Sequence, residues 1–111
     1  MAKDDYFVIV YQVLKYLYEQ LKKGEKIDKD YFKEAPIEIN KKYWHYIIEN
    51  MLKQEYITGI IIKETKDKKI YYYNNIEITP KGIEYLFDNN LMSKAKKALE
   101  GIKDIASIFP I

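Results

Sequence analysis

The chain has 111 residues, 48% of them hydrophobic and 15% aromatic, which excludes an intrinsically disordered protein and predicts a single folded domain over residues 1–111. It contains no cysteine, so a disulfide framework is excluded and a cytoplasmic location is expected; no apolar stretch approaches the roughly 20 residues that cross a bilayer, so no membrane insertion is expected. The formal net charge of +2 is only mildly basic and by itself gives weak support to nucleic-acid binding.

The first predicted element is a helix from Asp5 to Lys23, which Gly24 ends. Its apolar residues form two neighbouring rows at spacings of three and four, namely Phe7, Val10, Leu14, Leu17 and Leu21, and Tyr6, Ile9, Val13 and Tyr16. The rows leave only a narrow polar strip, formed by Gln12, Lys15, Glu19 and Lys22. A helix of this kind needs packing partners on more than one side.

The next segment predicts two further helices. Ile27 forms either a short strand or part of the core, and a brief helix starts near Asp28 and ends by Pro36. Asn40 is a good N-cap for a longer helix that runs to about Gln54. The buried face of this longer helix is expected to consist of Trp44, Ile47, Ile48, Met51 and Leu52.

A β-hairpin and two helices complete the predicted order. The β-branched run from Ile57 to Lys63 predicts one strand, residues 66–68 a charged turn, and residues 69–78 the returning strand. Thr79 and Pro80 are typical of a helix start, and this helix is expected to end near residues 89–90. A last helix is expected over about residues 91–108.

This order predicts an α+β, mainly helical fold of the winged helix-turn-helix type. It has a three-helix core, a β-hairpin wing and additional C-terminal helices. The winged-helix core is expected to span about residues 4–89, and the C-terminal helix belongs to the same domain.

Two passages of the chain resemble a known family. The run LKQEYITG at residues 52–59 looks like the L-x-x-G-Y-I-x-G passage that joins recognition helix to wing in the YjcQ-like family of small winged-helix proteins. The run ITPKGIEYL at residues 78–86 looks like its L-T-x-K-G-x-x-Y-L passage, and residues 93–95 and 102–105 are similar to its C-terminal helix. The resemblance covers roughly residues 5–106 and implies a winged-helix fold of bacterial or phage-related origin. The chain departs from the family at Glu55, where glycine is usual, and this disfavours a left-handed C-cap.

The helix after Asn40 occupies the recognition position, and the N-terminal half of such a helix enters the major groove of DNA. Its lysines are expected to contact phosphates and its other polar side chains to approach base edges. The candidate contacts are Lys41, Lys42, Tyr43, His45, Tyr46 and Asn50. A solvated helix face is the alternative interpretation, and Glu49 would repel a phosphate backbone. The chain has no arginine, the commonest bidentate reader of guanine, which makes tight guanine readout less expected.

The wing offers further candidate phosphate contacts at Lys66, Lys68 and Lys69. A charged turn that is simply solvated is the alternative. Three consecutive tyrosines follow at residues 71–73, and they either stack on exposed bases or on a partner, or pack on the core. Strand alternation sends Tyr72 to the face opposite its two neighbours, so at least one of the three is expected to face the core.

No residue set indicates catalysis or metal binding. His45 is the only histidine, and the chain offers no cysteine or second histidine to share a metal ion with it. Ser93 and Ser107 lie beside no recognisable base, and the chain has no glycine-rich phosphate loop. We therefore expect no enzyme activity, no metal site and no cofactor.

The last predicted helix carries an apolar seam with lysines opposite. The seam consists of Met92, Ala95, Leu99, Ile102, Ala106 and Phe109. Its partner is the first helix of the same chain, the first and last helices of a second copy in a homodimer, or a membrane surface.

These features together predict a small winged-helix protein that binds double-stranded DNA and acts as a transcriptional regulator of bacterial or phage origin. The alternative is a non-enzymatic protein–protein interaction module with the same fold. The modest charge, the missing arginine, the acidic Glu49 and the 12 tyrosines favour that alternative.

Overall fold

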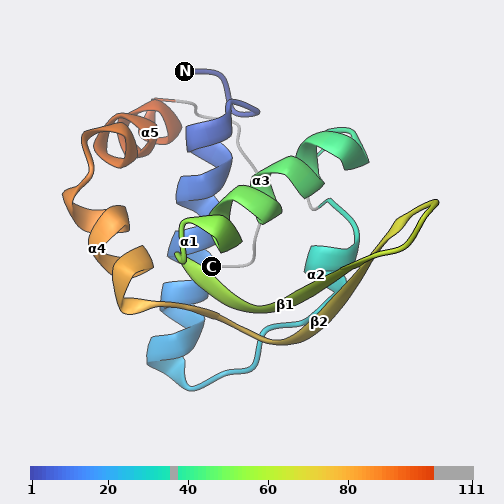
Figure 1. Ribbon diagram of the computed structural model, residues 1–111. Coiled ribbons are helices and arrows are strands. Elements are labelled where there is room, and N and C mark those ends of the chain that lie inside the picture. The colour runs from blue at the N-terminus through green and yellow to red at the C-terminus, as the bar shows by residue number, and fades with distance from the viewer. Residues whose placement is uncertain (36–37, 102–111) are drawn as a thin grey trace.

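The computed structural model describes residues 1–35 and 38–101 (Figure 1). The elements follow one another as α1 (Tyr6–Lys23), α2 (Asp30–Lys33), α3 (Lys41–Lys53), β1 (Ile57–Glu64), β2 (Lys69–Ile78), α4 (Pro80–Asp88) and α5 (Asn90–Glu100). The two strands form one antiparallel hairpin. Three helices, a hairpin and C-terminal helices are the order of a winged helix, and the prediction of an α+β winged-helix fold is confirmed.

Helix α1 is the centre of the core. It contacts α3, α4, α5 and β2, and Figure 1 shows these elements grouped around it. Val8, Val13 and Leu14 are fully buried, and the prediction that this helix packs on more than one side is confirmed. Gln12, which belongs to the narrow polar strip of this helix, is buried as well, with only 5% of the residue exposed. Packing from several sides covers more of α1 than its two apolar rows indicate.

Helix α3 is positioned by its N-cap and by one tryptophan. The Asn40 side chain accepts a hydrogen bond from the Tyr43 backbone N–H at 2.8 Å, as expected of an N-cap. Trp44 is fully buried, and its Nε1 donates to the backbone carbonyl of Phe32 in α2 at 3.0 Å. Ile27 lies in no strand and packs half-buried against the core. The inner side of α3 is therefore fixed, and its opposite side faces outward.

The C-terminal end of α3 is closed by a left-handed residue that is not glycine. Glu55 has a φ of 63°. Its N–H donates to the Leu52 carbonyl and the Tyr56 N–H donates to the Met51 carbonyl, each at 3.0 Å, which is the hydrogen-bond pattern of a Schellman motif. The glycine-type cap therefore forms even with glutamate at this position. A side chain in this conformation costs about 1 kcal/mol.

Replacing Glu55 by glycine is expected to raise the free energy of unfolding by about 0.5–1 kcal/mol, because glycine adopts positive φ without steric strain. Denaturant unfolding followed by circular dichroism measures the change. The matched control is Gln54→Gly, one residue earlier, where φ is −78° and the same substitution is expected to destabilise. Equal effects at the two positions would contradict the role of the left-handed conformation.

The positions of the hairpin that face the core change at a bulge about halfway along the strands. The strand register shifts between Thr58 and Ile60, where Gly59 and Asn75 both have positive φ, of 95° and 55°. On one side of this bulge Ile76 and Ile78 are buried; on the other, Tyr71 and Tyr73 are half-buried and pack against the core. Tyr72 is exposed, as strand alternation predicts. A side chain at residue 59 would overlap the backbone of Asn75, so only glycine fits there.

The two passages that carried the family resemblance contact each other. The Thr79 N–H donates to the Tyr56 carbonyl at 2.9 Å, and the Thr79 hydroxyl donates to the Glu55 carbonyl at 2.6 Å. The same hydroxyl accepts from the Gly82 N–H at 3.0 Å and so caps α4. Threonine and glycine therefore anchor the start of α4 onto the end of α3.

Helix α5 packs within the chain. It contacts α1, and its seam residues Met92 and Ala95 are fully buried, while Leu99 is half-buried. The other predicted seam residues, Ile102, Ala106 and Phe109, lie outside the described residues. Across the described ranges, the helices are too short or too polar to span a bilayer.

Candidate nucleic-acid interface

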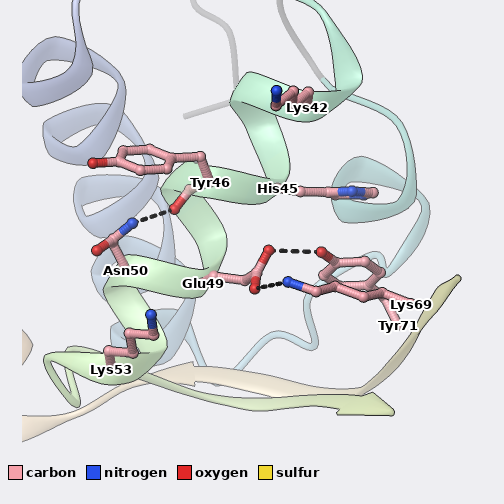
Figure 2. A pocket seen from close by; sticks show the side chains of 8 residues that line it. All are labelled: Lys42, His45, Tyr46, Glu49, Asn50, Lys53, Lys69 and Tyr71. Atoms are coloured by element: carbon pink, nitrogen blue, oxygen red, sulfur yellow. Dashed lines mark hydrogen bonds and ion pairs between the residues drawn. The ribbon is translucent and has the colours of Figure 1, made fainter. Parts of the chain in front are cut away.

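The outward side of α3 and the adjoining part of β2 form an open groove of about 560 Å³. It is lined by Lys42, His45, Tyr46, Glu49, Asn50, Lys53, Lys69 and Tyr71. Figure 2 shows Tyr46 and Asn50 on one side of α3 and His45 and Glu49 on the other, toward the hairpin. Three lysines and one glutamate give the groove a positive charge.

The single acid of the groove is held by the wing. The Lys69 ammonium donates to one Glu49 carboxylate oxygen at 2.8 Å, and the Tyr71 hydroxyl donates to the other at 2.8 Å (Figure 2). Burial acts to raise the pKa of the Glu49 carboxyl, but the hydrogen bonds from Lys69 and Tyr71 outweigh it and hold the pKa below its ordinary value. The hydrogen bond to Glu49 likewise raises the pKa of Lys69. Both groups are therefore ionised near neutral pH, and their charges compensate each other.

A stacked pair of rings lies beside this ion pair. The His45 and Tyr71 rings have centroids 4.0 Å apart and an interplanar angle of 24°. Burial and the nearby Lys41 charge lower the pKa of His45, so its imidazole is mostly neutral at pH 7. Burial and the hydrogen bond to Glu49 raise the pKa of Tyr71, which keeps its hydroxyl protonated as a donor. These contacts join the recognition helix to the wing.

The remaining candidates on α3 differ in their freedom to contact a ligand. Lys41 and Lys42 are exposed, and Tyr46 is 58% exposed. Tyr43 is half-buried, and its hydroxyl donates to the backbone carbonyl of Asp4 at 2.9 Å, which ties it to the N-terminal segment. Asn50 is half-buried beside Tyr46, at the outer side of the groove.

The predicted wing lysines separate into two kinds. Lys66 and Lys68 are exposed in the turn, which hydrogen bonds between Thr65 and Lys68 close. Lys69 instead lies in the groove, at 2.8 Å from Glu49 and 3.7 Å from Glu64. Of the predicted contacts, the groove brings together Lys42, His45, Tyr46, Asn50 and Lys69. Lys41, Tyr43, Lys66 and Lys68 are not among its lining residues.

Sequence reasoning missed part of this arrangement. It treated Glu49 only as a repulsive charge, left Lys53 out of the candidate DNA contacts, and expected Tyr71 to stack on bases or on the core and not to hold Glu49. Lys53 could have been found from its helical spacing to Tyr46 and Asn50. The pairing of Glu49 with β2 has no local sequence signal, because it joins residues 20 and 22 positions apart.

The described residues contain no cluster of three or more histidine, cysteine or acidic side chains that could hold a metal ion. No curated protein and no solved structure matches the chain. The family model described as YjcQ protein matches residues 11–105, which is most of the sequence and includes both passages at the junction of α3 and α4. The chain therefore belongs to the YjcQ protein family.

Proposed function

We propose that this protein binds double-stranded DNA without catalysing a reaction, and that it regulates transcription. The observation that supports the proposal best is the positive groove on the outward side of α3, the helix in the recognition position. A recognition helix contacts bases and phosphates with the side that faces away from the core. Here that side carries Lys42, Tyr46 and Lys53, and the buried Trp44 holds the opposite side in place.

The wing extends this surface. Figure 1 shows the hairpin projecting beyond the helices, and its turn carries the exposed Lys66 and Lys68. Lysines at such a tip are suited to contact the phosphate backbone beside the groove that the recognition helix occupies. The ion pair between Glu49 and Lys69 removes most of the repulsion that an isolated Glu49 would exert on phosphates.

Fluorescence anisotropy with random duplex DNA, from about 50 to 200 mM salt, tests the proposal. Affinity is expected to fall steeply with salt, because each lysine–phosphate contact releases counterions. The double variant Lys66→Ala/Lys68→Ala is expected to bind more weakly on all sequences and to flatten the salt slope by about two units. The matched control is Lys94→Ala/Lys97→Ala, which removes the same charge from exposed positions of α5.

Unchanged binding by the wing variant, or equal losses in both double variants, would contradict a wing contact. No binding by the unmodified protein at about 50 mM salt would overturn DNA binding itself.

A protein-interaction module is the second candidate, and one surface favours it. Phe87 is 62% exposed and packs edge-on against Tyr18, at a ring-centroid distance of 5.5 Å. The two rings lie along a groove between α1, α4 and α5, away from the lysines of the wing. A homodimer would need a surface other than Met92 and Ala95, because one chain buries both completely. This candidate would be supported if the unmodified protein bound no DNA and the Phe87→Ala variant lost the binding of a protein partner.

A further inference from the structure

The orientation of the Asn50 side-chain amide is fixed by the helix on which it lies. Its Nδ2 donates to the backbone carbonyl of Tyr46 at 2.8 Å, as Figure 2 shows. This bond distinguishes the nitrogen of the amide from its oxygen, since a carbonyl oxygen only accepts. It leaves Oδ1 as an acceptor and the second N–H of Nδ2 as a donor. Asn50 therefore offers one acceptor and one donor from the same amide.

That pair of groups matches the major-groove edge of adenine. Adenine presents the N7 acceptor beside the N6 amino donor, so an asparagine amide makes two hydrogen bonds with it. Guanine presents two acceptors, N7 and O6, and O6 would face the Asn50 Oδ1 without a proton between them. The same amide therefore favours adenine over guanine.

The rest of the groove lacks a planar fork that would read guanine, since its lysines are flexible point charges. The chain contains no arginine. Both Glu49 carboxylate oxygens already accept a hydrogen bond from the wing, which draws the carboxylate toward the hairpin and makes it a poorer acceptor for the amino group of cytosine. The exposed ring of Tyr46, one helical turn from Asn50, provides an apolar surface suited to the thymine methyl group.

We infer that α3 reads an A·T base pair from its middle and C-terminal half, further along the helix than the N-terminal half expected from the sequence, with Asn50 hydrogen-bonded to the adenine edge and Tyr46 against the methyl group of thymine. Lys42 and Lys53, which line the groove beside them, hold the phosphates. The inference rests on the proposed DNA binding and specifies the sequence class that the groove selects.

The experiment compares two duplexes of equal length, one A·T-rich and one G·C-rich, by anisotropy at one salt concentration. The protein is expected to bind the A·T-rich duplex about tenfold more tightly, the discrimination of one bidentate contact. Asn50→Ala is expected to abolish this preference, because its affinity for the A·T-rich duplex falls more than its affinity for the G·C-rich one. The matched control Asn74→Ala, an exposed asparagine on β2, is expected to keep the preference.

A third duplex separates base readout from DNA shape. In it, 7-deazaadenine replaces adenine, which removes the N7 acceptor and leaves the minor groove unchanged. The affinity for this duplex is expected to fall toward the affinity for the G·C-rich duplex. Equal binding of the A·T-rich and G·C-rich duplexes would overturn the A·T inference and leave DNA binding intact. A preference for A·T that persists both in the 7-deazaadenine duplex and in the Asn50→Ala variant would do the same. Absence of binding to every duplex would overturn both.

Discussion

Substituting alanine for Gly82 is expected to lower the free energy of unfolding by about 2–3 kcal/mol, the cost of overpacking a site that cannot relax. A methyl group there would overlap the Tyr56 carbonyl oxygen and lie 2.8 Å from the Ile78 Cγ1. The carbonyl cannot move away freely, because it also accepts the Thr79 N–H. Alanine favours a helix over glycine by only about 1 kcal/mol, so the overlap outweighs the gain in propensity. Denaturant unfolding measures the loss.

Gly24→Ala is the control for this substitution. Gly24 has a φ of 71°, but an added methyl group would meet no atom within 4 Å, so only the conformational cost of about 1 kcal/mol is expected. A Gly82→Ala variant that is as stable as the unmodified protein would show that α4 is not held against the end of α3. Retained stability would also remove the structural reason for glycine in this family passage.

Replacing Glu49 by glutamine is expected to raise the affinity for random duplex DNA about tenfold near 50 mM salt. The substitution removes the one negative charge of the groove and frees Lys69 from its nearest acidic partner, which leaves Glu64 at 3.7 Å. Each phosphate contact that Lys69 then gains steepens the salt slope by about one unit. The glutamine amide oxygen can still accept from Tyr71, so the junction of α3 and the wing is expected to persist. Since both partners of the ion pair are partly exposed, the stability change should stay within about 1 kcal/mol.

The matched control is Glu84→Gln, an exposed glutamate on α4 that does not line this groove. It changes the net charge by the same amount, so a difference between the two variants reports on position and not on total charge. Equal affinities for DNA would argue against Glu49 facing the phosphate backbone. A weaker binder would indicate that the ion pair is needed to present the recognition helix.

The order of the elements could be predicted because local signals agree with the packing. Asn40 and Thr79 cap helices as their types and positions indicate, and apolar spacing identified the buried side of α3. The burial of Gln12 could not be predicted, because it depends on how many elements surround α1. The left-handed cap at Glu55 was disfavoured by residue type and still formed, since two hydrogen bonds and the contact with Thr79 hold that backbone in place.

The candidate site was less accessible to sequence reasoning. The lysines of α3 and of the wing could be identified from their positions, but whether a lysine is free depends on residues far away in the chain. Lys68 and Lys69 are adjacent, yet one is exposed at the turn and the other is bound to Glu49 in the groove. Tyr43 was expected to face DNA, while its hydroxyl contacts Asp4, 39 positions earlier. Tertiary contacts of this kind leave no periodic pattern.

The bulge at Gly59 and Asn75 divides the hairpin into two parts with different constraints. Toward the helices, Ile57, Ile76 and Ile78 belong to the core, and changes there alter the fold. Toward the tip, from Glu64 to Lys68, the side chains are exposed, and the backbone only has to close a turn. The tip can therefore vary in sequence and length at little cost to the rest of the molecule. Related proteins can acquire different ligand preferences there while keeping the same scaffold.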